Sequence, residues 1–299
     1  MTKNVLASIF AAARDLVRTP RALAVLVALY LALIAAVFFF ITTREATLWQ
    51  LIVTGATALL APLLFFVVQA AVASYAVGER GAGELLRRTA RSFLKVLAAS
   101  VPVILLLVLS VYLLNKLERR AELTPEERSN VEYSRSVSEG DAESASEAAK
   151  PKPPVRWKYL FVSALRLLVL GLFLPLIAIH LWLAAARDGL VAAFARFHRH
   201  LLRAFSASSL LTYGVGMIVF ALIPYFLITK RTPVTNNTLE LAIFGARILL
   251  AFSLMLFGWV MTVAALARIG GQATAATTTT TEPALDQPHP HTAPATATS

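Results

Sequence analysis

The sequence predicts an all-α, polytopic membrane protein: a helix bundle of six transmembrane helices with three basic amphipathic helices in the membrane interface. Composition is the first reason, because 58% of the 299 residues are hydrophobic and only 15% are charged, against about 45–50% and 25% in soluble domains. Distribution is the second reason, since the charged residues lie between long apolar runs. The third reason is that an arginine-containing amphipathic stretch precedes three of these runs.

Six apolar runs are long enough to cross the hydrocarbon core, which takes about 20 helical residues. The first run follows Arg14, Arg18 and Arg21 and exceeds the roughly 7–15 residues of a signal-peptide core, so we expect it to be retained as a span. Pro62 removes one helix hydrogen bond from the second run and is expected to kink it. The six predicted spans are residues 22–42, 48–77, 96–115, 159–186, 205–228 and 239–267.

The amphipathic stretches cover residues 5–19, 81–95 and 189–203. At 100° per residue, the middle stretch places apolar side chains such as Leu85 and Phe93 on one half and basic side chains on the other. Such a helix is typical of the membrane interface. In the third stretch, the same spacing predicts that His198 faces the apolar side and His200 the basic side. Candidate lipid or anion contacts on the basic faces are Arg88, Arg91, Lys95, Arg196, Arg199 and Arg203.

The chain also shows signs of an internal repeat within a single membrane domain, residues 1–271. Offsets of 108 and 81 residues align basic residues without gaps, which favours three copies of a basic helix followed by a two-span hairpin. Convergent composition is the alternative explanation. A true repeat predicts equivalent places for the aligned pairs, which are Arg88 with Arg196, Arg91 with Arg199, Arg166 with Arg247 and Arg187 with Arg268.

The distribution of lysine and arginine predicts the topology. Basic residues concentrate near the N-terminus and in the interfacial helices, whereas the short opposite turns carry only Arg44, Lys230 and Arg231. We expect a multi-pass protein of the cell membrane, and the positive-inside rule places both of its termini in the cytoplasm. Residues 116–158 and the Thr/Ala/Pro-rich tail at 272–299 are polar or low in complexity, and we expect both to be largely disordered.

Polar residues within the spans offer little chemistry. No Asp or Glu lies deep in any span, which argues against a proton- or sodium-coupled carrier. Gln69 and His180 are isolated intramembrane polar residues, for which an interhelical hydrogen bond is the simpler expectation. Arg166 and Arg247 lie near the outer ends of their spans, either extending toward headgroups or forming a shared anion or lipid-phosphate site. With no cysteine and no catalytic motif, we expect no catalytic residue, metal or cofactor.

A family resemblance rests on the A-R-x-x-x-R pattern at Ala13–Arg18 and on the spacing of the basic residues in the other two amphipathic stretches. On these residues the chain resembles the membrane-domain proteins associated with bacterial glycerophosphodiester phosphodiesterases, over about residues 1–270. The resemblance implies six spans with repeated interfacial helices. The phosphodiesterase catalytic domain of such proteins, with its metal-binding carboxylates and histidines, is absent from residues 1–299, so the resemblance implies no activity.

These observations favour a non-enzymatic membrane scaffold, or a protein that binds anionic membrane lipids or another membrane protein. The net charge of +11 is explained by the cytoplasmic loops and by anionic lipid rather than by a nucleic-acid partner. The alternative is a transporter or flippase-like protein for a lipid or small anion, with Arg166 and Arg247 at its outer mouth. A water-lined cavity between the second, fourth and sixth spans would favour this alternative, and a closed, dry bundle would favour the scaffold.

Overall fold

The structure is a computed structural model that describes residues 2–43, 47–121, 157–230 and 237–279. This part of the chain is helical and contains no strand. The elements in chain order are α1 (Thr2–Arg18), α2 (Pro20–Thr42), α3 (Leu48–Val77), α4 (Ala82–Ala121), α6 (Trp157–Arg166), η2 (Leu167–Phe173), α7 (Leu174–Asp188), α8 (Leu190–Ala195), α9 (Phe197–Ala204), α10 (Ala207–Met217), η3 (Ile218–Leu222), α11 (Ile223–Thr229) and α12 (Asn237–Thr279).

The described residues contain six helical segments that are long and apolar enough to cross a membrane, which confirms the predicted class. The second has the predicted bounds, and the first, fourth and fifth differ from the predicted spans by one or two residues at an end. The third candidate span runs on to Arg120, and α12 continues to Thr279, into the stretch that we expected to be a disordered tail. Most of the predicted polar loop and the remainder of the tail lie outside the described residues. The candidate spans are Pro20–Thr42, Leu48–Val77, Ala82–Arg120, Leu160–Asp188, Ala207–Thr229 and Thr238–Gly271.

The packed core lies toward one end of the bundle. Buried side chains gather in the second half of α3, along α7 and around residues 260–267 of α12. Many are alanines, such as Ala71, Ala185 and Ala265, which let helix backbones approach closely in a membrane. Large apolar side chains elsewhere are exposed, as expected for surfaces that contact lipid. We call the core-side end, with α1, the first half of α4, α8 and α9, the basic end.

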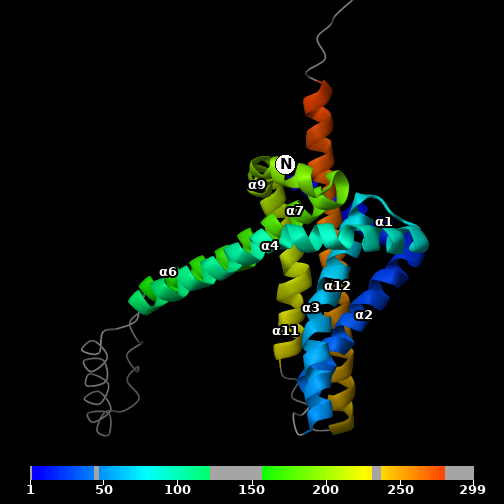
Figure 1. The fold of residues 1–299 in the computed structure, drawn as a ribbon, viewed down its shortest axis with the longest axis vertical. Helices are drawn as coiled ribbons and strands as arrows, with labels where there is room; N and C mark the ends of the chain where they lie inside the picture. Colours follow the sequence, from blue (N-terminus) through cyan, green and yellow to red (C-terminus); the bar gives the residue numbers. More distant parts are fainter. Residues whose placement is uncertain (1, 44–46, 122–156, 231–236, 280–299) are drawn as a thin grey trace, which may run out of the picture.

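The helix α4 joins the predicted interfacial stretch and the third span in one uninterrupted helix of 40 residues. No glycine interrupts residues 84–121, and Pro102 lies within the helix without ending it. The side chains of Leu85, Thr89 and Val96 are buried against the bundle, whereas Arg87 and Arg91 are exposed, as the spacing predicts. Figure 1 shows the second half of α4, with α6 alongside it, pointing away from α2, α3, α11 and α12.

The prediction of one continuous amphipathic helix over residues 189–203 is wrong, because this stretch forms two short helices, α8 and α9. Between α8 and α9 the backbone breaks at Arg196, with φ −108° and ψ 21°. The break rotates α9 relative to α8, so faces assigned from one continuous helix do not hold. His200 is buried and His198 is exposed, the reverse of the prediction. No glycine or proline marks this break in the sequence.

Spans four and five each contain a π-helical segment, η2 and η3, directly before a proline-led helix. Pro175 and Pro224 lie in the first turn of α7 and α11. A proline has no N–H to donate and its ring clashes with the carbonyl four residues earlier, which a wider π turn relieves. For Pro175 that carbonyl belongs to Gly171, and it accepts a hydrogen bond of 3.0 Å from the hydroxyl of Tyr213 on α10. The neighbouring span thus satisfies the carbonyl that proline leaves without a partner.

Candidate functional site

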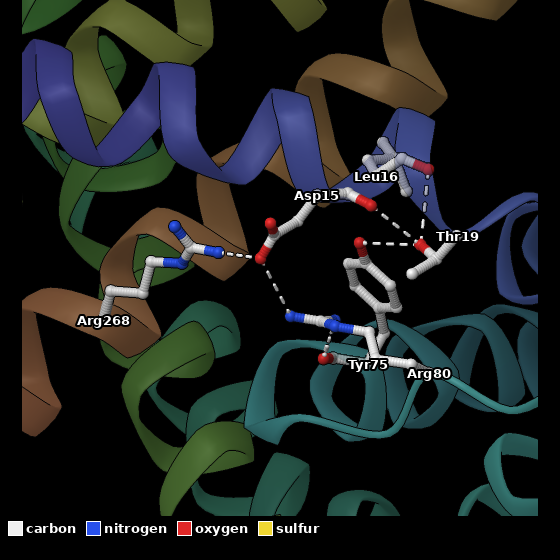
Figure 2. Close-up of polar contacts among 6 residues, drawn as sticks. All are labelled: Asp15, Leu16, Thr19, Tyr75, Arg80 and Arg268. Atoms are coloured by element: carbon white, nitrogen blue, oxygen red, sulfur yellow. Dashed lines mark hydrogen bonds and ion pairs between the residues drawn. The ribbon is translucent and has the colours of Figure 1, made fainter.

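A charge cluster at the basic end ties α1 to the bundle, as Figure 2 shows. The carboxylate of Asp15 forms an ion pair with Arg268 of α12, and Arg80 approaches the same oxygen at 3.6 Å. The Arg80 guanidinium lies 4.1 Å from the ring centroid of Tyr75 and donates a 2.7 Å hydrogen bond to its carbonyl. Thr19 lies within 3.3 Å of the Tyr75 hydroxyl and donates to the backbone of Asp15 at 2.9 Å. This cluster has a structural role, because one carboxylate joins α1 to Arg268 of α12 and to Arg80, which follows α3.

Arginines at the ends of the hairpins link successive parts of the bundle. Arg88 of α4 donates to the carbonyl of Ala186 at 3.4 Å, and Arg187 of α7 donates to the carbonyl of Ala267 at 3.4 Å. Arg268 then closes the series by pairing with Asp15 of α1. Arg187 and Arg268 are aligned by the 81-residue offset, but one contacts a backbone carbonyl and the other a carboxylate. Arg88 lies within a continuous helix, whereas its aligned partner Arg196 lies at a helix break. The internal repeat therefore stays a prediction.

A basic cavity of about 420 Å³ lies between α4 and the end of α7. Three predicted contact residues, Arg88, Arg91 and Lys95, line this cavity. Arg88 forms an ion pair with Glu79 in addition to its bond to α7, so its position is fixed. The sequence-based list of candidates omitted the other charged residues on the cavity wall. These are Arg87, Arg187, Glu79 and Glu84.

A second cavity, of about 490 Å³, lies between the membrane-spanning helices and is almost entirely apolar. Residues from all six candidate spans line it, including Tyr30, Phe66, Val103, Leu174, Phe220 and Trp259. Its volume falls within the roughly 300–1,000 Å³ typical of small-molecule sites. The cavity reaches between the second, fourth and sixth spans, as the transporter alternative required, but its lining is not polar.

Polar groups on the wall of the apolar cavity are hydrogen-bonded to one another. The Trp259 indole donates to Oε1 of Gln69 at 2.9 Å, which confirms the interhelical hydrogen bond expected for Gln69. The Trp182 indole donates to Ser100 at 2.8 Å. These pairings satisfy groups that would be costly to leave unpaired in a membrane. The cavity is therefore suited to an apolar ligand with few polar groups.

The two cavities lie on different sides of α4. Arg91 lies in the middle of the set that lines the basic cavity, and Val103 is in the set that lines the apolar one. They are twelve residues apart, so their side chains point about 120° apart around the helix. The apolar cavity faces the interior of the bundle, whereas the basic cavity is bounded by the exposed, charged face of α4. One helix therefore separates a charged site from an apolar one.

Two buried histidines meet at a small cavity of about 40 Å³ between α7, α9 and α12. His180 and His200 are 7% and 8% exposed, and Nε2 of each has no hydrogen-bond partner within the described parts of the chain. The expected interhelical hydrogen bond of His180 is therefore not formed at Nε2. Burial, and next the nearby charge of Arg203, lower the pKa of His200 on α9.

The remaining predicted contact residues are not brought to either large cavity. Arg166 pairs with Glu118 of α4 at 3.4 Å, and Arg247 donates to the carbonyl of Lys230 at the end of α11. Each arginine thus contacts the end of the preceding helix in its own hairpin, but the two hairpins point in different directions (Figure 1). This arrangement gives no support to a shared outer anion site. Arg196 and Arg199 are exposed on and beside α9, and Arg203 lines the histidine cavity.

Comparisons with protein-family models, with curated proteins and with solved structures found no match to this chain.

Proposed function

We propose that the protein is a non-enzymatic, lipid-binding protein of the cell membrane, which holds the apolar chain of a membrane lipid in the cavity between its six spans. The apolar cavity is the observation that carries this proposal. Its wall consists of aromatic and aliphatic side chains, and its polar groups include two that are already paired, Gln69 with Trp259 and Ser100 with Trp182. A hydrocarbon chain needs no hydrogen bonds, so it can fill an apolar cavity without leaving a buried polar group unpaired.

The basic end adds a contact with anionic lipid headgroups. Its candidate contact residues are those on α4 and around α9, and each basic residue near an anionic surface contributes about 1 kcal/mol. We place this end in the cytoplasm, because lysine and arginine concentrate there. In support, the beginning of α1 and the end of α12 lie at the same end of the molecule (Figure 1). The resemblance to phosphodiesterase-associated membrane domains remains a proposal and adds no activity.

The experiment blocks the apolar cavity and measures retained lipid. Ile104→Trp combined with Leu107→Trp places two large side chains on the α4 wall of the cavity. The control is Leu105→Trp with Leu109→Trp, on the same hairpin but outside the cavity lining, where both leucines are exposed. We expect native mass spectrometry to find co-purified lipid on the wild type and the control, and several-fold less on the blocked variant. Equal lipid retention by all three proteins would refute the proposal.

A transporter or flippase-like protein is the second candidate, since the cavity reaches between the second, fourth and sixth spans. Its predicted outer site lacks support, because Arg166 and Arg247 are engaged in separate hairpins. Reconstituted vesicles with a fluorescent phospholipid distinguish the two. A binding protein leaves the rate of transbilayer movement at that of protein-free vesicles, whereas a flippase-like protein accelerates it and loses the acceleration when the cavity is blocked.

A further inference from the structure

We propose that the basic cavity between α4 and α7 is a specific binding site for a phosphate group. This goes beyond contact of a basic surface with anionic lipid, because it assigns one cavity, one chemical group and a defined set of side chains. It also does not depend on a lipid chain in the apolar cavity, since the two cavities lie on different sides of α4.

The geometry of α4 presents a row of cations to the cavity. Arg87, Arg91 and Lys95 are spaced four residues apart, so they lie one above another on a single face of the helix. All three are exposed, and none forms a hydrogen bond or ion pair with the other residues that the structure describes. Like charges at this spacing repel one another. An anion bound in the cavity would attract all three side chains and offset the repulsion between them.

The α7 wall of the cavity contributes a further cation, and a hydrogen bond holds this wall against α4. Arg187 extends from the end of α7, and Ala186 beside it accepts the hydrogen bond from Arg88. Because Arg88 is already paired with Glu79, it holds α4 against α7 rather than remaining available to a ligand. Arg87, Arg91 and Lys95 therefore lie across the cavity from Arg187, which also donates to the carbonyl of Ala267. The Arg88 contacts set the width of this cavity.

The charge and the donor chemistry match phosphate. Five cationic and two acidic side chains line the cavity, so an excess of three positive charges faces a group that carries up to two negative ones. Arginine offers a planar fork of N–H donors that binds two phosphate oxygens at once. The phosphate could be that of a lipid headgroup at the membrane surface or a free anion from the aqueous side, since both present the same oxygens.

The test measures phosphate binding by the full chain in a nonionic detergent at constant ionic strength. The probes are inorganic phosphate, dihexanoyl phosphatidic acid, and dihexanoylglycerol, which has the same chains without phosphate. Arg87→Gln with Arg91→Gln removes two cavity cations. The control is Arg14→Gln with Arg18→Gln, which removes two exposed arginines at the same spacing on α1, outside the cavity lining. Calorimetric titration gives the affinity, and the thermal midpoint without ligand verifies folding.

We expect saturable binding of a phosphate-bearing probe that weakens at least tenfold in the cavity variant and less than twofold in the control. Binding of phosphatidic acid alone identifies a lipid headgroup as the source, whereas binding of both probes identifies the phosphate group itself. The proposal is overturned if neither probe binds saturably, if dihexanoylglycerol binds as well as phosphatidic acid, or if both double variants lose affinity equally. If the cavity variant has a lower midpoint than wild type, Lys95→Gln alone serves as the second variant, with the same outcomes. The lipid-retention measurement on the apolar cavity succeeds or fails independently of these results.

Discussion

The indole of Trp259 on α12 donates a 2.9 Å hydrogen bond to the side-chain carbonyl of Gln69 on α3, although the two residues are 190 positions apart in sequence. Both residues line the apolar cavity, so the bond fixes the distance between two of its walls. Gln69 is buried, and an unpaired amide in a membrane is costly. The bond thus explains how a polar side chain can occupy an apolar site.

A double-mutant cycle should measure this bond. Interhelical hydrogen bonds in membrane proteins average about 0.6 kcal/mol and reach about 1.7 kcal/mol. We therefore expect a coupling free energy in that range for Gln69→Leu and Trp259→Phe, obtained from denaturation of each single variant and the double variant in detergent. Additive effects of the two substitutions would show that the bond contributes no stability.

Helix packing between α10 and α12 depends on the absence of a side chain at Gly216. A Cβ atom added there would lie 2.0 Å from Oγ1 of Thr262. Overpacking of this kind costs about 1–3 kcal/mol. We expect Gly216→Ala to lower the thermal midpoint clearly, whereas Gly214→Ala, with no atom within 4 Å of the added Cβ, should change it little. A similar effect of both substitutions would indicate that helix propensity, rather than packing, decides the outcome.

The Asp15 cluster should make the docking of α1 sensitive to salt. Asp15→Asn removes the charge that Arg80 and Arg268 share, and partly exposed pairs contribute about 0.2–1 kcal/mol each. We expect a free energy of unfolding lower by about 1 kcal/mol at low ionic strength, with a smaller difference at 0.5 M NaCl. Asp15→Glu keeps the charge and should recover part of the loss. A salt-independent difference would point to packing instead.

The buried His200 should make the basic end less stable at acidic pH. Its pKa lies below the value of about 6.5 for a free histidine, chiefly through burial. As pH falls below 6.5, the unfolded segment binds a proton that the folded one does not, so stability is lost down to the folded pKa, by at most about 1.4 kcal/mol per pH unit. The charges that act on it are those of Arg203, Asp188, Arg196 and Arg187, of which only Asp188 favours protonation.

Thermal midpoints at pH 7.5 and pH 5 check this dependence. His200→Gln should lower the difference between the two midpoints, because it removes the proton-binding site. His198→Gln is the matched control, since His198 lies on the same helix but is exposed. If both variants keep the wild-type difference, titration of His200 does not control stability in this range.

The absence of cysteine allows a direct test of the topology. A single cysteine introduced by Ser138→Cys reports on the loop between the third and fourth spans, and one introduced by Ser299→Cys reports on the C-terminus. On intact cells, a membrane-impermeant maleimide should label only the loop cysteine, with the C-terminal one labelled after permeabilisation. The opposite pattern would place the basic end outside and exclude the orientation proposed above.

The sequence predicts features that local periodicity determines. The six spans and the buried face of α4 follow from the spacing of apolar residues, and the interhelical hydrogen bond of Gln69 follows from the cost of an unpaired amide. The break at Arg196 has no such local signal, so the helix faces predicted for His198 and His200 were wrong. The π-helical segments did have one, because a proline, Pro175 or Pro224, lies in the first turn of the helix that follows each segment. The cavities depend on how distant helices pack, which no single stretch of sequence specifies.

The length of α4 has a mechanical consequence. Its 40 residues form a rod about 60 Å long, with the phosphate-site arginines near one end and the free edge of the α4–α6 hairpin at the other. If the rod pivots by about 5° where it crosses α7, displacements of several ångströms follow at the far tip. A ligand bound among those arginines that changed the angle between α4 and α7 would therefore displace the far end of the α4–α6 hairpin.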